Sequence, residues 1–209
     1  MRLTKFSHAC VRFEGDGGVL VVDPGTWSER AALDGVDAIL FTHEHVDHVD
    51  QDALADALDA RPHARVYTHP EVAVKLDAAH DRITTVDAGD RFEAAGFPVQ
   101  AFGGWHAVIH PDVPRVVNLG FLIGSVYHPG DSFDVPDGHV DTLFVPISAP
   151  WLKLAEAIDF VRAVRPRQAF GLHDALLNDN GIQLTSRLMS QLTGTEYRRL
   201  TPGSSIELP

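Results

Sequence analysis

The sequence predicts an α/β fold in which two sheets pack face to face between outer helices, a four-layer αββα sandwich. Short strand-like runs gather in both halves of the chain, and segments with helical spacing of apolar residues accompany each group. No repeat, low-complexity tract or linker interrupts the 209 residues. We therefore expect residues 1–209 to form a single domain.

The first half is rich in expected strands. The run Gly15-Asp16-Gly17-Gly18 is a strong turn signal between two apolar runs and predicts a hairpin. A helix is expected over 50–60, where Leu54, Ala57 and Leu58 recur at helical spacing, and another over 71–79, directly after Pro70. The strands expected in this half cover residues 4–6, 9–13, 19–22, 38–41, 66–68, 83–86, 91–94 and 99–102.

The second half repeats this arrangement. The segment 152–164 carries its apolar residues on one helical face, and a second helix is expected over 182–192. The irregular stretch 105–115 contains two histidines and two prolines, which favours a functional loop. The strands expected here cover residues 116–123, 125–127, 142–145, 168–171, 197–200 and 205–208.

Composition limits the function classes. The formal net charge of -12 argues against nucleic acid as the main partner, because a phosphate backbone calls for a basic face. No apolar stretch of membrane-spanning length and no signal-peptide pattern occurs, so we expect a cytoplasmic protein that acts on a small molecule and not on a membrane. The single cysteine, Cys10, lies in an apolar run and is expected to be a buried, inert thiol.

The feature that carries most chemistry is the run His43-Glu44-His45-Val46-Asp47-His48, which follows the apolar strand 38–41. Imidazoles and carboxylates are ligands for zinc, manganese, iron and nickel. His43 and His45 are two residues apart, a spacing that suits ligation of one ion from extended backbone. Asp47 and His48 point elsewhere and can serve a second ion. Two ions in one site are suited to hydrolysis. A structural zinc site is disfavoured because it usually employs several cysteines.

A two-metal site needs further ligands from other strand ends. Three candidates follow apolar runs, with glycine nearby that lets the backbone approach closely: His106, Asp131 and His173. His110 lies four residues after His106 and competes with it for the same role. The spacing alone leaves these two alternatives open, although His106 is nearer the strand end.

Together with two longer segments of the chain, these residues indicate a known protein family. The motif H-x-H-x-D-H at 43–48, the later His106, Asp131 and His173 in order, the opening segment 7–25 and the segment 146–174 together resemble the metallo-β-lactamase superfamily. Within it, the chain is similar to small single-domain metal-dependent hydrolases such as ascorbate-6-phosphate lactonase. The resemblance covers nearly the whole chain and implies the metallo-β-lactamase-like αββα fold.

The resemblance also implies a ligand set for two divalent ions, zinc or manganese before iron or nickel. One ion would be held by His43, His45 and His106, and the other by Asp47, His48 and His173. Asp131 would bridge the two ions, and Asp23 would orient a ligand histidine. Asp47 and Asp131 are the candidate catalytic residues. A metal-bridging hydroxide would then hydrolyse a small-molecule ester, lactone, amide or phosphodiester.

Two other functions fit the same motif. One is a non-catalytic metal-binding sensor or binding protein on the same fold, and the other is an iron-dependent redox or sulfur enzyme. Around the expected centre, three further histidines are candidates for substrate contact: His8, His110 and His128. A purely structural role is the alternative for His8 and His128. Trp105, Trp151 and Phe133 either line a pocket or pack in the core.

Overall fold

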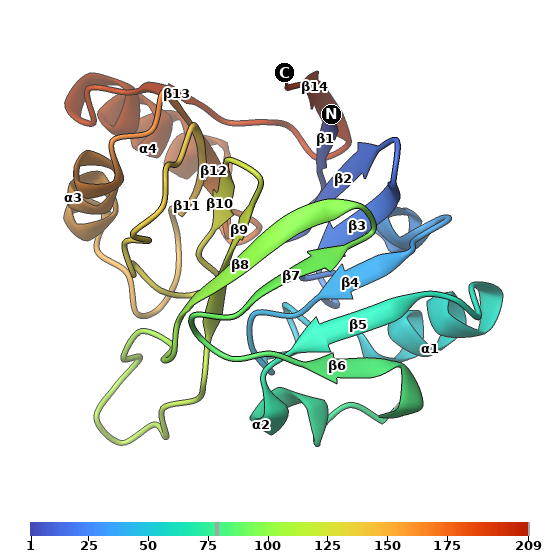
Figure 1. Ribbon diagram of the computed structural model, residues 1–209. Helices are drawn as coiled ribbons and strands as arrows, with labels where there is room; N and C mark the ends of the chain where they lie inside the picture. Colours follow the sequence, from blue (N-terminus) through green and yellow to red (C-terminus); the bar gives the residue numbers. More distant parts are fainter. Residues whose placement is uncertain (78–79, 209) are drawn as a thin grey trace.

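The computed structural model describes residues 1–77 and 80–208 and consists of two mixed seven-stranded sheets (Figure 1). The first sheet contains β1 (Arg2–Lys5), β2 (Val11–Gly15), β3 (Gly18–Val22), β4 (Ala38–Leu40), β5 (Arg65–Thr68), β6 (Ile83–Thr85) and β14 (Ser204–Glu207). Its strand order is β14-β1-β2-β3-β4-β5-β6, so the last strand returns to pair with the first.

The second sheet contains β7 (Arg91–Ala94), β8 (Phe97–Gly103), β9 (Leu119–Ile123), β10 (Val126–His128), β11 (Thr142–Pro146), β12 (Gln168–Leu172) and β13 (Glu196–Arg198). Its order is β13-β12-β11-β10-β9-β8-β7. The helices are α1 (Gln51–Ala60), α2 (Pro70–Ala73), α3 (Leu154–Val164) and α4 (Asp179–Leu192), with short 3₁₀ turns η1 (Arg30–Leu33) and η2 (His80–Arg82).

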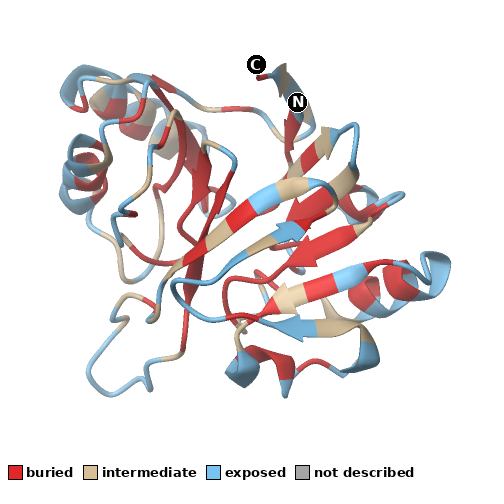
Figure 2. Ribbon diagram, viewed as in Figure 1, coloured by how far each residue is buried: buried red, intermediate tan, exposed pale blue. Residues whose placement is uncertain are grey.

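The alternation of side chains along the strands builds three apolar layers. On β3, Leu20 and Val22 point into the core between the sheets, whereas Val21 between them packs toward α1. On β9, Phe121 belongs to the core between the sheets and Leu122 to the layer beneath α3 and α4. Burial is correspondingly concentrated in the strands and on the inner faces of the helices (Figure 2). The predicted four-layer αββα sandwich is thus confirmed.

Both sheets combine antiparallel hairpins with a parallel half. The expected turn at 15–18 closes the β2–β3 hairpin, in which Gly15 pairs with Gly18. Strands β3 to β6 run parallel, as do β10 to β13. In parallel sheets the loops at the carboxyl ends of the strands form the natural binding crevice. The candidate ligands lie on such loops except for His106, which follows the antiparallel strand β8.

The helix expected over 71–79 is wrong in length. The structure has a single helical turn, α2, and the chain leaves the helix at Val74. The Gln51 side chain explains this: it donates to the carbonyl of Lys75 (2.8 Å) and accepts from the N–H of Asp77 (3.2 Å). It thereby satisfies backbone groups that a longer helix would have used. Residues 78 and 79 of the expected helix lie outside the described residues.

Other boundaries shift by a few residues. The strand expected over 116–123 begins at Leu119, and the helix expected over 182–192 begins at Asp179, where the Asn178 side chain caps it by accepting from the N–H of Gly181. Within the described chain, no helix is both long enough and apolar enough to cross a membrane.

Candidate metal centre

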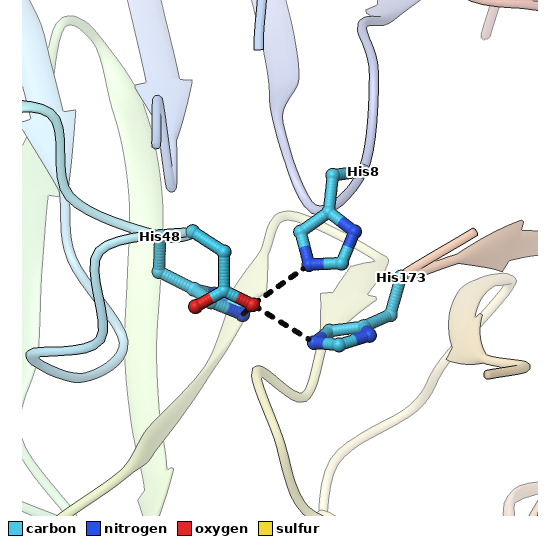
Figure 3. A group of neighbouring side chains, drawn as sticks. His8, His48 and His173 are labelled. Carbon is cyan, nitrogen blue, oxygen red and sulfur yellow. Dashed lines mark hydrogen bonds and ion pairs between the residues drawn. The ribbon is translucent and has the colours of Figure 1, made fainter. Parts of the chain in front are cut away.

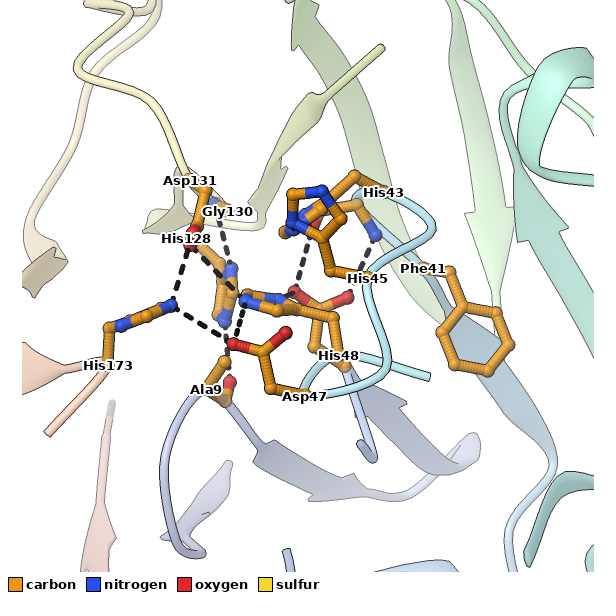
Figure 4. A network of polar contacts seen from close by, with 12 residues as sticks. Ala9, Phe41, His43, His45, Asp47, His48, His128, Gly130, Asp131 and His173 are labelled. Atoms are coloured by element: carbon orange, nitrogen blue, oxygen red, sulfur yellow. Dashed lines mark hydrogen bonds and ion pairs between the residues drawn. The ribbon is translucent and has the colours of Figure 1, made fainter. Parts of the chain in front are cut away.

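The candidate ligands converge from both sheets on one largely buried cluster, and all of them except His106 are labelled in Figure 4. The loop after β4 supplies His43, His45, Asp47 and His48, while His106 follows β8, Asp131 follows β10 and His173 follows β12. Asp23 lies one residue beyond β3. Every one of these loops leaves the carboxyl end of its strand, so the topology itself brings them together.

The loop that carries the motif is a compact turn. The backbone N–H groups of His48 and Val49 both donate to the carbonyl of His45 at 2.9 Å, which turns the chain before α1 begins. Gly25 packs directly against this turn, and a Cβ at that position would collide with the backbone of Asp47. The loop after β3 therefore supports the motif through a contact that only glycine allows.

Two sets of side chains face each other in the cluster. The first consists of His43, His45 and His106, whose ligand atoms lie within 4.8 Å of one another. The second, under the same limit, consists of His8, Asp47, His48 and His173. The predicted ligands thus fall into the two groups that the resemblance implies, with His8 as an addition.

Asp131 lies between the two sets. Its Oδ1 is 3.3 Å from Nε2 of His48, and its Oδ2 is 3.3 Å from Nε2 of His106 and 3.1 Å from Nε2 of His173. Ligand atoms that sit about 2.0–2.2 Å from a shared ion are themselves roughly 3–3.5 Å apart. The spacing around Asp131 therefore suits a carboxylate that contacts ions on both sides.

Four of the histidines are held in the same orientation. In each, Nδ1 lies within hydrogen-bond distance of an oxygen acceptor, which places the proton on Nδ1 and turns the free lone pair of Nε2 toward the cluster. The pairs are His43 with Thr42 Oγ1 (2.9 Å), His48 with Asp23 Oδ2 (2.7 Å), His106 with the carbonyl of Ala107 (2.5 Å) and His173 with the carbonyl of Ser148 (2.6 Å).

The inward-facing atoms are orphaned. Nε2 of His48, His106 and His173 and Oδ1 of Asp131 are buried and have no hydrogen-bond partner among the described residues. Leaving buried polar atoms unpaired costs about 1–3 kcal/mol each. Four such atoms aimed into one small volume fit divalent metal ions, which would use every lone pair.

The protonation states divide the clustered histidines into two kinds, those with a lowered pKa and those with a raised pKa. Burial, followed by the neighbouring His48, lowers the pKa of His43, and burial, followed by His106, lowers that of His45. Burial works against ionised Asp131, yet His48 and His173 hold the pKa of its carboxyl well below the usual range. Burial opposes protonation of His48 and His173, but Asp131 outweighs it and raises the pKa of His48 well above its usual range and that of His173 to about 9. Metal ions would therefore have to displace the Nε2 protons of these two imidazoles when they bind.

The three histidines considered as substrate contacts have different surroundings. His110 is exposed and its Nδ1 lies 3.5 Å from Asp112, so His106 and not His110 lies in the cluster. The structure does not support His128 as a substrate contact. The residue is fully buried, with Nε2 donating to the carbonyl of Ala9 (2.8 Å) and Nδ1 accepting from the N–H of Gly130 (3.2 Å). No ring atom of His128 is left for a substrate, and its role is structural.

Trp151 is a site residue whose role the sequence did not reveal. Its indole Nε1–H donates to Oδ2 of Asp131 over 2.9 Å. Its ring also packs edge-on against Phe133, with the ring centroids 5.2 Å apart. The contact joins the loop after β11 to the loop after β10, and no local pattern signals such a pairing. Trp151 therefore fixes the carboxylate at the centre of the cluster.

The cluster opens toward the loop between β8 and β9. A small cavity of about 20 Å³ touches His45 and His106 and is lined on its other side by Val108, Val113 and Arg115. A larger hollow of about 300 Å³ lies between η1 and α1, but none of the clustered side chains lines it. None of the buried side-chain atoms without a hydrogen-bond partner among the described residues belongs to its wall.

Comparisons with known proteins agree with this arrangement. Residues 2–173 match the sequence profile of a family described as "Beta-lactamase superfamily domain". A Mycobacterium tuberculosis protein is 36% identical over 213 residues, covering 99% of both chains. A UPF0173 metal-dependent hydrolase of Aeropyrum pernix is 28% identical, covering 99% of this chain and 97% of its own. The solved structure of Igni18, a metallo hydrolase from Ignicoccus hospitalis, superposes with a TM-score of 0.76 at 20% identity, covering 100% of this chain and 99% of that one.

Proposed function

We propose that this chain, which belongs to the β-lactamase superfamily and is a metal-dependent hydrolase, cleaves a small-molecule ester, lactone, amide or phosphodiester at a two-metal centre. The superfamily expected from the motif is thereby confirmed. The proposal beyond it concerns the number of ions, the ligand set and the substrate.

The observation that carries the proposal is the set of orphaned lone pairs. Nε2 of His48, His106 and His173 converges on Asp131, and each imidazole is locked by a hydrogen bond at its other nitrogen. We assign one ion to His43, His45 and His106, a second to Asp47, His48 and His173, and a contact with both to Asp131. Zinc and manganese suit these nitrogen and oxygen donors.

When bound, such ions polarise a scissile carbonyl or phosphoryl oxygen and lower the pKa of water. The chain's own residues supply the rest. Asp131 and Asp47 remain ionised next to the imidazoles and offset the positive charge of the centre. Trp151 and Asp23 fix Asp131 and His48 in place by single hydrogen bonds, so the centre needs little reorganisation during the reaction.

The rim of the centre favours a substrate with an apolar group beside the scissile bond. Val46 lies between two proposed ligands and is 66% exposed, and Val108, on the wall of the small cavity, is 57% exposed. Among the described residues, Arg115 is the one cation on that wall, and its Nε donates to the carbonyl of His106 (2.6 Å). We therefore favour a neutral ester, lactone or amide over a phosphodiester.

The test is hydrolysis by protein loaded with zinc or manganese, measured on chromogenic esters, lactones, amides and phosphodiesters that differ in the length of their apolar group. We expect turnover of at least one neutral class and a kcat/KM that rises with apolar length. Asp131→Ala should abolish it, whereas Asp134→Ala, an exposed aspartate three residues along, should leave it unchanged. Metal content by mass spectrometry should give two ions per chain.

Two results would contradict the proposal. One is a fully loaded protein that turns over none of these substrate classes. The other is undiminished hydrolysis by the Asp131→Ala variant, which would place the reaction somewhere other than the cluster.

A further inference from the structure

We propose that His8 is a positioning residue of the metal centre, which holds the Asp47 carboxylate through a hydrogen bond from its Nε2–H. The inference rests on the proposed two-metal site, because it assigns His8 a role toward one of the ligands of that site. It explains why a histidine from the β1–β2 loop is buried beside Asp47 and His173, which are far from it in the sequence.

The contact itself is short and enclosed. Nε2 of His8 lies 3.0 Å from Oδ2 of Asp47, and the His8 side chain is completely buried (Figure 3). Nε2 of His173 lies 3.5 Å from the same oxygen, and the two rings are neighbours, with their centroids 3.9 Å apart. Asp47 Oδ2 is therefore approached by two imidazole nitrogens, only one of which is free to ligate an ion if the other is a donor.

The hydrogen-bond partners of the two imidazoles decide which is the donor. Nδ1 of His173 donates to the carbonyl of Ser148, so its Nε2 carries a free lone pair. Nδ1 of His8 is buried and has no partner among the described residues. A proton on Nδ1 of His8 would thus be unsatisfied, and its Nε2 lone pair would face a carboxylate oxygen. The proton belongs on Nε2, where Asp47 accepts it.

The backbone is built to hold this ring in place. His8 has a left-handed conformation (φ 58°), as do His173 (φ 57°) and Asp23 (φ 49°) of the same cluster. Such conformations in residues other than glycine cost on the order of 1–3 kcal/mol and gather at functional sites. Three of them around one cluster indicate that the fold maintains this geometry against strain.

A buried cation secures the strained loop. The carbonyl of His8 accepts from Nζ of Lys5 (2.7 Å) and from the N–H of His173 (3.1 Å). Lys5 is fully buried and lies 3.4 Å from Asp174, the residue after His173. The loop that carries His8 is thereby attached to the loop that carries the proposed ligand His173.

The ring is also enclosed on its faces. Trp27 packs edge-on against His8 with the ring centroids 4.7 Å apart, and the His173 ring lies on another side at 3.9 Å. Rotation of the His8 ring is blocked by these neighbours. Its Nε2–H is held toward Asp47, which fixes the carboxylate and reduces the charge it donates to an ion.

The same arrangement recurs at Asp131. There the indole N–H of Trp151 donates to Oδ2 at 2.9 Å. Each of the two carboxylates in the proposed ligand set thus receives one ring N–H, from His8 at Asp47 and from Trp151 at Asp131. The resemblance of the two contacts supports a positioning role for His8 instead of a ligand role.

The first experiment measures metal affinity without substrate, by competition with a chromophoric chelator. His8→Phe keeps a ring but removes the donor, and we expect the affinity for one of two zinc ions to fall by about 10–100-fold. His8→Gln carries an N–H at the reach of Nε2 and should recover most of that loss. His110→Phe, an exposed histidine outside the cluster, should bind both ions as the unmodified protein does.

The proposal would be overturned if His8→Phe bound both ions as tightly as the unmodified protein does. It would also be overturned by a His8→Gln variant that folds but binds metal as weakly as His8→Phe. Because substrate is absent from the measurement, a failure to find hydrolysis would weaken the proposed function and leave this result standing.

The second experiment needs no variant. Long-range ¹H–¹⁵N spectra of the zinc-loaded protein report the tautomer of each imidazole. We expect His8 to carry its proton on Nε2, while His48, His106 and His173 carry theirs on Nδ1. A proton on Nδ1 of His8 together with a zinc-shifted Nε2 signal would make His8 a ligand and overturn the positioning role.

Discussion

Nδ1 of His48 donates to Oδ2 of Asp23 over 2.7 Å, with both side chains completely buried. The same carboxylate accepts from the backbone N–H of Thr42 (2.8 Å) and from its hydroxyl (2.7 Å), and that hydroxyl accepts from Nδ1 of His43. One aspartate therefore orients a histidine of each proposed ligand set, directly in one case and through a threonine in the other.

This relationship predicts that Asp23→Asn weakens metal binding. The amide keeps the size of the side chain and tolerates the left-handed backbone at this position (φ 49°), so the fold should persist. The charge that orients His48 is lost, and we expect the metal affinity to fall by about 10–100-fold. Chelator competition measures it, and Asp16→Asn, in the exposed turn of the first hairpin, is the control. An affinity within twofold of the unmodified protein would contradict the role of Asp23.

The cluster also predicts how the protein responds to pH once its metal is removed. Burial opposes the charge of His173, but Asp131 and Asp47 outweigh it and raise the pKa of His173 to about 9 from its ordinary 6.5. A raised pKa stabilises the fold below the unfolded value, and this stabilisation is lost as the pH rises through the folded value. Stripped protein should therefore lose on the order of 2 kcal/mol between about pH 6.5 and 9.

Thermal unfolding across that range checks the sign. Metal-loaded protein should behave in the opposite way, because ions compete better for deprotonated imidazoles. His173→Asn, which suits the left-handed backbone there, should flatten the curve of the stripped form. A stripped protein whose melting temperature rises over this interval would show that His173 is not charged in the folded state.

The sequence predicted which residues carry the chemistry of the site better than it predicted the contacts that hold them in place. The motif at 43–48 and the later strand-end residues could be recognised because ligand types and strand periodicity are local patterns. His106 was separable from His110 only once the loop geometry showed which ring is buried. Metal binding by these residues stays a prediction.

The misses share one cause, which is side chains acting over long sequence distances. Gln51 ends the helix expected over 71–79 from 24 residues away, and Trp151 reaches Asp131 from 20 residues away. His128, offered as a substrate contact, is taken up by the backbone of Ala9, 119 residues earlier. Periodicity and spacing carry no signal for such contacts, because they depend on how the two sheets pack.

The buried Lys5 predicts a large effect on stability. It lies within 3.4 Å of Asp174, which also accepts from Arg199 at 2.7 Å, and both Lys5 and Asp174 are almost fully buried. Lys5→Met keeps the length of the side chain but leaves Asp174 short of a partner, so we expect a loss of roughly 3 kcal/mol in the free energy of unfolding. Arg2→Met is the matched control on the same strand.

Arg2 is 56% exposed and pairs with Glu14 at 3.7 Å, so its removal should cost less than about 0.5 kcal/mol. Urea unfolding of both variants compares them directly. Equal stabilities for the two variants would mean that the buried cation does not hold the loop of His8.

The position of Gly25 predicts that a side chain there would disrupt the metal centre through a steric clash. A Cβ at this position would overlap the backbone of Asp47 and crowd the N–H of His48, and backbone atoms cannot move aside as a flexible side chain can. Gly25→Ala should therefore displace the turn at 45–48 and reduce the bound metal to less than one ion per chain, even where the protein remains folded. Gly181→Ala is the control, because the tightest contact of its Cβ would be the end of the flexible Leu177 side chain at 3.0 Å, within a helix that favours alanine. Metal content and circular dichroism of the two variants separate loss of the site from loss of the fold. A Gly25→Ala protein that retains two ions would show that the loop after β3 does not fix the motif.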